Sequence, residues 1–410
     1  MRQKASFNRK ALNPHPHCPM KFRLSFCLFL LFALSRPAYT QSVEEVVVGS
    51  KYLIESAVLG ETREYWIRLP DTYELESASH AEYPLLIVLD GQAQFEFASS
   101  MLNYMSRGRS DSRRVPEMVV VGVASTNRER DFTPDKIVTR RKNDTGGADQ
   151  FLAFLESELL PLLQEKYRLS SFDILMGHSL GGLFAVHTYL KPETEFDAFI
   201  AIDPSFGTWD DEKMSGKVES ATDNSFDRFL YIATANWGAR NLGNRDRHVQ
   251  FYEAMHRRAG DERFRAKTEY FEHEDHSSVP VIAFHNGLSA MFEGYGMTFR
   301  DVTSLEQMTE QYRILSNRLS HDFPPPEGLV NRVGYRMLQS EDEQQRKEAL
   351  GFFELNADNY PKSSNAFDSL GEAFAAVGRK AEAIQAYRKS LELNPRNENA
   401  SAQLEKLTAE

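Results

Sequence analysis

Short apolar runs alternate with amphipathic stretches over the first three quarters of the chain. The apolar runs predict buried strands at 83–89, 117–123, 174–176, 196–202, 229–234 and 266–271. Helical spacing of apolar residues marks 94–105, 147–167, 183–190, 248–258 and 279–292. Buried strands that alternate with helices predict a mostly parallel sheet with helices on both faces. Two further strands, 51–58 and 64–69, predict an antiparallel edge of this sheet.

The pattern changes after Gly294. Residues 301–327 are polar and close on a run of three prolines, which predicts a stiff linker. Beyond the linker, similar residues recur 34 positions apart, which is the spacing of the tetratricopeptide repeat. The recurring pairs are Ala349 and Ala383, Phe353 and Tyr387, and Pro361 and Pro395. Residues 328–410 are therefore predicted to form a small all-α tail of helical hairpins.

The repeat pattern of the tail is incomplete. Val333, Gly334, Tyr335 and Leu338 in the first unit lie out of frame with the second. Two units are fewer than an independent array needs, so we expect the tail to pack on the main domain or on a partner protein.

Residues 1–40 differ from the rest of the chain. They hold seven Lys or Arg and no acidic residue. A basic head beginning at Met20, an apolar run at 24–34 and small residues after it are typical of a secretory signal peptide. The run is too short for a membrane span, although an uncleaved anchor stays an alternative. We expect a secreted or periplasmic protein, and both cysteines, Cys18 and Cys27, would leave with the leader.

The net charge of the chain limits the classes of partner that it is expected to bind. The net charge is −11, and this negative balance argues against binding to a phosphate backbone. We therefore expect no nucleic-acid partner and no membrane span in the mature chain. The expected domains are a leader at 1–40, a main domain at 41–300, a linker at 301–327 and the tail at 328–410.

One predicted turn between a strand and a helix contains a candidate catalytic residue. Gly177-His-Ser-Leu-Gly-Gly182 follows the apolar run 174–176 and has the G-x-S-x-G pattern of a nucleophile elbow. So sharp a turn would leave no room for side chains at Gly177 and Gly181, and it would lift the Ser179 hydroxyl clear of the backbone. A glycine-rich turn with Ser179 as helix cap is the plain alternative. The strand before and the helix after favour Ser179 as nucleophile.

A serine nucleophile needs a base that a third group orients. In this type of fold the order along the chain is serine, acid, histidine. His273 and His276 follow the last predicted strand, and His276 is preferred because it lies deeper in the loop. Asp246 is the predicted acid, with Asp203 as the alternative. A metal site at His273 and His276 lacks a third ligand.

Acyl chemistry also needs donors for the oxyanion. The backbone N–H of Leu180 is one candidate, and that of Gly91 or Gln92, after strand 83–89, is the other. A glycine at 91 would let the backbone approach the substrate. Candidate pocket residues are His178, Trp209 and Trp237.

These motifs together resemble the esterase branch of the α/β-hydrolases that includes enterochelin-esterase-like and esterase D-like proteins. The motifs are Leu89-Asp-Gly-Gln, Val121-Gly-Val-Ala, Arg128-Glu-Arg-Asp-Phe-Thr-Pro134, Gly177–Gly182, Pro204-Ser205 with Trp209, and His276-Ser-Ser-Val. The resemblance implies an α/β-hydrolase fold, ester hydrolysis without metal or organic cofactor, and catalytic roles for Ser179 and His276. The family often has serine in place of Asp203, and glutamate where this chain has Trp237-Gly238, so the acid stays open.

The sequence thus predicts an exported serine hydrolase for a small-molecule ester, with a siderophore lactone as one option by analogy. Acyl transfer to an acceptor other than water would use the same residues. A scaffold without catalysis, whose tail at 328–410 recruits a protein partner, is the alternative from a different class.

Overall fold

The computed structural model describes residues 45–107, 113–136, 144–206, 211–221, 226–238, 243–261 and 263–409. The predicted signal peptide, its apolar run at 24–34, both cysteines and Trp209 lie outside these ranges. Within them, no helix has the length and apolar character needed to cross a bilayer.

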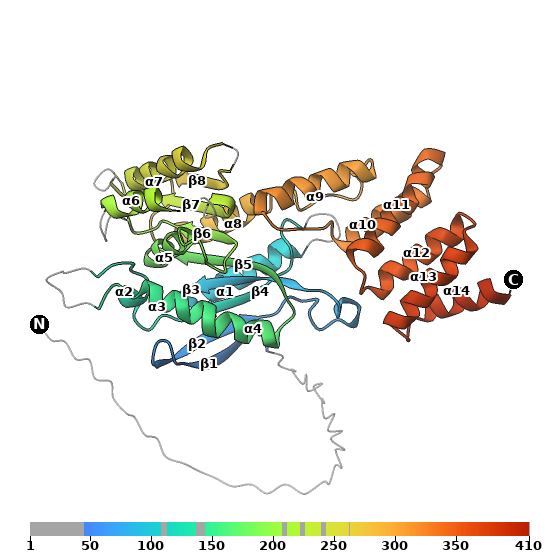
Figure 1. Ribbon diagram of the computed structural model, residues 1–410, viewed down its shortest axis with the longest axis horizontal. Helices are drawn as coiled ribbons and strands as arrows, with labels where there is room; N and C mark the ends of the chain where they lie inside the picture. The colour runs from blue at the N-terminus through green and yellow to red at the C-terminus, as the bar shows by residue number, and fades with distance from the viewer. Residues whose placement is uncertain are drawn as a thin grey trace, which may run out of the picture. The chain divides into compact units, whose positions relative to one another are not determined.

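An eight-stranded sheet occupies the centre of the main domain (Figure 1). Its strands are β1 (Ser50–Ser56), β2 (Glu61–Arg68), β3 (Tyr83–Leu89), β4 (Val119–Val123), β5 (Leu169–His178), β6 (Ala198–Ile202), β7 (Phe229–Ala235) and β8 (Ala266–Phe271). The order is β1-β2-β4-β3-β5-β6-β7-β8. The pairs β1–β2 and β2–β4 are antiparallel and the other pairs are parallel, as the sequence pattern predicts.

Continuous apolar runs form the central strands because both faces of the sheet are covered. In β3, Leu86 and Val88 join the apolar cluster on one face, while Leu85, Ile87 and Leu89 join the cluster on the other. Successive side chains of a strand point to opposite faces of the sheet, so β3 contributes to the apolar core on each face. The predicted α/β class is confirmed.

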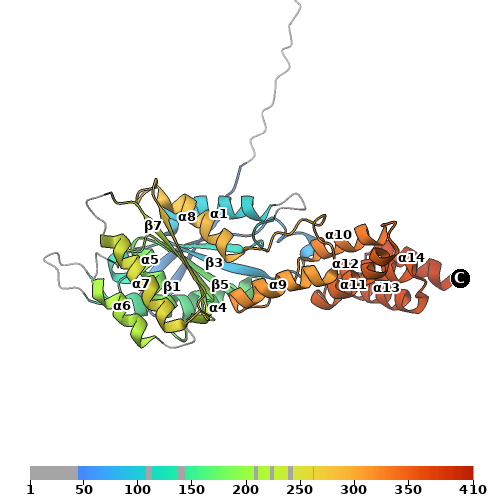
Figure 2. The ribbon, with the colours of Figure 1, turned by 90° about the horizontal axis from the view of Figure 1, so that it is seen from above.

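Helices cover the two faces in separate layers (Figure 2). One face carries α1 (Gly91–Ser106) and α8 (Val279–Met291). The other carries α3 (Ala148–Phe154), a π-helical turn (Leu155–Leu159), α4 (Leu160–Lys166), α5 (Leu180–Tyr189), α6 (Asp211–Ser220) and α7 (Gly243–Ala259). The short helix α2 (Arg128–Asp131) follows β4.

The segment predicted as a linker contains a helix, α9 (Leu305–Leu319). Its buried residues are Met308, Tyr312, Leu315 and Leu319, which lie on one face and belong to the same apolar cluster as α1 and α8. Ser304 caps the helix by accepting the N–H of Gln307 at 3.1 Å. Residues 301–327 are therefore not an extended linker over this helical part. Only four of the 15 residues in this helix are buried, so its polar composition hides the apolar stripe.

The tail consists of α10 (Glu327–Leu338), α11 (Glu343–Asn359), α12 (Ser364–Ala376), α13 (Lys380–Leu393) and α14 (Glu398–Ala409). Gly334 lies against the ring of Phe353, as Gly371 lies against the ring of Tyr387. Gly334 and Gly371 are 37 positions apart, whereas Phe353 and Tyr387 are 34 positions apart. The two spacings differ because α11 is 17 residues long and α13 only 14. The extra turn of α11 explains the residues out of frame. The assignment to the tetratricopeptide class stays a prediction.

The first hairpin of the tail shares a core with the main domain. Leu329, Val330 and Val333 of α10 and Phe352 of α11 are buried in the same apolar cluster as Met308 of α9 and the residues of α8. Residues 47–410 accordingly form one compact unit.

Candidate active site

Ser179 lies in a sharp turn between β5 and α5. Its φ of 62° and ψ of −117° are backbone values that a non-glycine residue adopts only when its surroundings hold it there. The Ser179 N–H donates to the carbonyl of Ile202 at 2.9 Å, and the Ser179 carbonyl accepts the N–H of Leu183 at 3.0 Å. The parallel pairing of β5 with β6 thus fixes the turn at the carboxyl edge of the sheet, where sites of this fold class lie.

The glycines around Ser179 have different reasons to be there. A Cβ on Gly177 would lie 2.1 Å from the carbonyl oxygen of Gly181, and one on Gly182 would lie 2.9 Å from that of Ile202. A Cβ on Gly181 would meet nothing closer than 3.5 Å. The sequence pattern predicts that side chains have no room at Gly177 and Gly181. The structure places this steric limit at Gly177 and Gly182, because Gly181 contributes its backbone to the crowding.

His276 lies between Ser179 and Asp203 in a chain of hydrogen bonds. The Ser179 hydroxyl lies 3.0 Å from Nε2 of His276. The opposite ring nitrogen, Nδ1, lies 2.5 Å from Oδ2 of Asp203. A carboxylate only accepts, so Nδ1 carries the proton and Nε2 is left to accept from the serine hydroxyl. The three side chains come from the carboxyl ends of β5, β6 and β8.

The structure does not bring Asp246, the predicted acid, to His276. Asp246 is exposed in the first turn of α7, whereas Asp203 is fully buried at the end of β6. The preference between the two carboxylates is therefore corrected in favour of Asp203. His273, the alternative base, is exposed in the loop after β8.

The Asp203 carboxylate is surrounded by donors. Besides Nδ1 of His276, Oδ2 accepts the indole N–H of Trp237 at 2.8 Å. Oδ1 accepts the N–H of Ala235 at 3.1 Å and the side-chain amide of Asn244 at 3.3 Å. Both oxygens are thus satisfied without water, which a buried charge requires.

These donors decide the ionisation of Asp203. Burial is the largest influence and would raise its pKa. The hydrogen bond from His276, the nearby His248, and the N–H groups of Ala235 and Trp237 together outweigh burial, so the pKa of Asp203 lies below its ordinary value. Asp203 is consequently an anion beside the imidazole over the physiological pH range.

Two of the three predicted pocket residues contact the ring of His276, and the third, Trp209, is outside the described residues. The ring centroids of His178 and His276 are 4.5 Å apart, and those of Trp237 and His276 are 4.6 Å apart. Burial, with the like charge of His276 as second cause, lowers the pKa of His178 to about 4. His178 is therefore neutral near pH 7, and Nε2 of its ring is buried without a partner among the described residues.

Two polar residues near Ser179 were not predicted from the sequence. The hydroxyl of Ser205 lies 3.0 Å from that of Ser179, and the Ser205 N–H donates to the Ser179 carbonyl at 3.1 Å. His248 is buried and holds the turn before Ser205: its Nε2 donates to the Pro204 carbonyl at 2.7 Å, and its Nδ1 accepts from the Thr234 hydroxyl at 2.8 Å. The sequence could have indicated Ser205, because it belongs to the Pro204-Ser205 motif. No sequence pattern indicated His248.

The expected oxyanion donors lie at the starts of two helices. Leu180 is the first residue of α5, and Gly91 and Gln92 are the first two of α1. First-turn N–H groups have no partner within the helix. The two turns are neighbours, since a Cβ on Gly181 would lie 3.5 Å from Oδ2 of Asp90.

Gly91 has a packing reason besides the one expected. A Cβ at this position would lie 2.6 Å from the ring of Trp66 and 2.7 Å from the backbone of Gly122. The missing side chain therefore lets α1 approach β2 and β4, while the approach of this backbone to the substrate stays a prediction.

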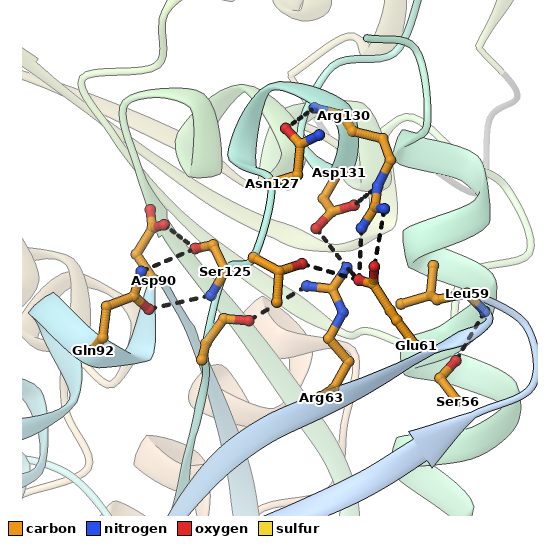
Figure 3. A network of polar contacts seen from close by, with 12 residues as sticks. Ser56, Leu59, Glu61, Arg63, Asp90, Gln92, Ser125, Asn127, Arg130 and Asp131 are labelled. Atoms are coloured by element: carbon orange, nitrogen blue, oxygen red, sulfur yellow. Dashed lines mark hydrogen bonds and ion pairs between the residues drawn. The ribbon is translucent and has the colours of Figure 1, made fainter. Parts of the chain in front are cut away.

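A polar network fixes the turn before α1 to the segment after β4 (Figure 3). The Asp90 carboxylate accepts from Nε and Nη2 of Arg128 at 2.7 and 2.9 Å, and also from the Ser125 hydroxyl. The Gln92 amide oxygen accepts the Ser125 N–H at 3.2 Å. The turn that offers Gly91 and Gln92 is therefore held in place by charged hydrogen bonds.

The network continues to the edge of the sheet through Arg63 of β2 (Figure 3). Arg63 is fully buried, and its Nη2 lies 2.6 Å from Oδ2 of Asp131 and 2.6 Å from Oε1 of Glu61. Arg130 pairs with the same two carboxylates at 2.7 Å. The hydrogen bond from Arg130 is the largest cause that lowers the pKa of Glu61 to about 2. Two cations and two carboxylates, one of each from α2 and one of each from β2, thus neutralise one another.

The sheet order, the covering helices and the turn at Ser179 define an α/β-hydrolase. A family model described as "Putative esterase" matches residues 56–323, well over half of the chain, so the chain belongs to this esterase family.

Three relatives are similar over different lengths. Ferri-bacillibactin esterase BesA of Bacillus subtilis is 30% identical over 141 residues, which are 30% of this chain and 48% of BesA. The siderophore triacetylfusarinine C esterase of Aspergillus fumigatus is 26% identical over 282 residues, 60% of this chain and 90% of that protein. The crystal structure of an IroE-like serine hydrolase from Shewanella oneidensis has a TM-score of 0.65 at 26% identity, and the match covers 74% of this chain and 98% of that one.

Proposed function

We propose that this protein is an exported serine hydrolase that cleaves carboxylic esters of siderophores. The observation that carries the proposal is the hydrogen-bonded chain from Ser179 through His276 to Asp203 at a strained strand-to-helix turn. Membership of the esterase family supports the reaction class, and the pattern of residues 1–40 supports export.

In the proposed mechanism, Ser179 Oγ attacks the ester carbonyl while its proton passes to Nε2 of His276. The buried Asp203 anion stabilises the imidazolium that forms. His276 then gives the proton to the leaving alkoxide, which leaves an acyl group on Ser179. Water, deprotonated by the same histidine, attacks this ester and releases the acid.

The oxyanion of each tetrahedral intermediate would be held by backbone N–H groups. Leu180 at the start of α5 is one donor, and Gly91 or Gln92 at the start of α1 is the other. Such donors act strongly because they are fixed before the reaction begins. The positive ends of the two helices add to their effect.

The mechanism is tested with the protein from Gln41 onward and a fluorophosphonate probe. We expect one stoichiometric adduct on Ser179, none in S179A and far slower labelling in H276A. Mass spectrometry of the peptides locates the adduct. A folded protein without an adduct, or with one elsewhere, would remove Ser179 from the mechanism.

The substrate class is tested separately with ferri-bacillibactin and triacetylfusarinine C, the esters that the names of two relatives specify. We expect kcat/KM for one of them to exceed that for p-nitrophenyl acetate by at least ~10²-fold, because binding of the remote groups contributes to transition-state stabilisation. Equal values would reject the siderophore class and leave the esterase intact. Hydrolysis of neither, with p-nitrophenyl acetate also inert, would reject both.

A further inference from the structure

Trp237 contacts both partners of the Asp203–His276 pair. Its indole N–H donates at 2.8 Å to Oδ2 of Asp203, the oxygen that also accepts from Nδ1 of His276 at 2.5 Å. Its ring centroid lies 4.6 Å from that of His276, at an interplanar angle of 45°. One side chain therefore donates to the carboxylate through its N–H and packs against the imidazole with the two rings tilted.

The loop that carries Trp237 is tied to the loop that carries His276. The N–H of Asn236 donates to the Glu274 carbonyl at 2.8 Å, and the Asn236 side chain donates to the Glu272 carbonyl at 2.7 Å. On the other side of the tryptophan, the Gly238 N–H donates to the Asn236 amide oxygen at 2.8 Å. The indole is thus held in place although 42% of Trp237 is exposed to solvent.

We infer that Trp237 is a positioning residue that holds Asp203 through its N–H and supports the His276 ring through its indole face. This inference rests on the proposed function, because it assigns the pair a role in activating Ser179. A hydrogen bond to a charged group is directional, so the indole N–H fixes the carboxylate rotamer. The negative face of the indole attracts an imidazolium, the form that His276 takes during the reaction.

The contact of Trp237 with Asp203 and its contact with His276 can be removed one after the other by substitution. W237F keeps an aromatic face and deletes the N–H, while W237L deletes both. We expect the rate constant for fluorophosphonate labelling of Ser179 to fall about tenfold in W237F, as for the loss of a hydrogen bond to a charged group. In W237L it should fall at least threefold further. Y104L, which changes a highly exposed aromatic on α1, is the control and should label at the wild-type rate.

A spectroscopic signature separates positioning from a merely structural role. A protonated imidazole in contact with an indole quenches its fluorescence, so emission from Trp237 should fall as His276 gains a proton. We expect this titration in the wild type and in W66F, and its loss in W237F and H276Q.

Other ionisable groups near His276 come from several elements. Asp203 follows β6, His178 ends β5, and Asp275 precedes His276 in its own loop. His248 of α7 acts on Asp203, and Arg128 of α2 acts on His178. H178Q removes the neighbouring histidine, and the quenching of Trp237 by His276 should persist in this variant.

The outcomes distinguish this inference from the proposed function. Wild-type labelling of Ser179 with normal labelling of W237F and an unchanged titration would overturn the inference and leave the hydrolase. A titration that depends on His276 and Trp237, in a protein that never labels, would reject the hydrolase and leave the ring contact without a catalytic role. Circular dichroism of each variant establishes that it is folded.

Discussion

Nδ1 of His276 lies 2.5 Å from Oδ2 of Asp203, and the two residues are 73 positions apart in the chain. Asp203 can reach the ring because its N–H donates to the Ala233 carbonyl of β7 at 2.8 Å and its φ is 40°, in the left-handed region. This turn, at the end of β6, directs the carboxylate toward the loop after β8. Asp203 therefore follows β6, the strand that pairs with β5, after which Ser179 lies.

We predict that D203N lowers kcat by about 10³–10⁴-fold, because an amide can donate to Nδ1 and favour the wrong tautomer of the imidazole. D246N is the matched control, since Asp246 is exposed on α7, and it should retain activity within about twofold. Steady-state hydrolysis of p-nitrophenyl acetate measures both. The reverse ranking would restore Asp246 as the acid.

The crowding at the turn predicts opposite results for two glycine substitutions. G177A should lose at least ~10²-fold in the labelling rate of Ser179, because its new methyl group would lie 2.1 Å from a carbonyl oxygen. G181A adds the same methyl group where the nearest atom lies at 3.5 Å, and it should label within about threefold of wild type. Comparable losses in both variants would contradict the steric account.

How much of this site the sequence could predict depends on how local each feature is. The turn at Ser179 is encoded by consecutive residues of one strand and one helix, so the motif sufficed. The choice between Asp203 and Asp246 depends on the pairing of β6 with β7 and on the path of the loop after β8, which no local pattern records. His248 is similar, because its role exists only through contacts with Pro204 and Thr234.

The fold shows the same division. Continuous apolar runs indicated every central strand, since burial on both faces leaves a strong signal, although the run at 174–176 marked only part of β5. The helix α9 was missed, although Met308, Tyr312, Leu315 and Leu319 have helical spacing, because polar residues and nearby prolines dominated the composition. The repeat in the first half of the tail could not be recognised from the sequence, because α11 is longer than α13 by about one turn.

A buried carboxylate in the middle of β5, that of Asp173, predicts how stability depends on pH. Burial raises the pKa of Asp173 to about 7, with Asp197 and Glu195 as further causes. An acid whose pKa is raised in the folded state favours folding at low pH. Its contribution is complete below about pH 4, the ordinary value for aspartate, and is lost as pH rises through about 7.

D173N should therefore raise the free energy of unfolding at pH 8 by about 2 kcal/mol and leave it nearly unchanged at pH 4. Urea denaturation at the two pH values measures the difference. The backbone N–H of Asp173, which donates to Asp197 at 2.8 Å, is kept in this variant. A gain of equal size at both pH values would show that the effect is not ionisation.

Truncation of the tail at two places tests whether its first hairpin belongs to the main domain. A chain ending at residue 326 loses α10 and α11, and with them Leu329, Val330, Val333 and Phe352 of the shared apolar cluster. Each buried side chain of this size contributes about 1.5–3 kcal/mol, so the melting temperature should fall by at least about 10 °C or the protein should aggregate. A chain ending at residue 361 keeps both helices and exposes the side of α11 that carries Phe353 and Ala357, together with Tyr335 and Leu338 of α10. It should melt within about 5 °C of the full chain and label at Ser179 at a similar rate. If both truncations melt like the full chain, the hairpin is an appended module, and its surface is free to bind a partner.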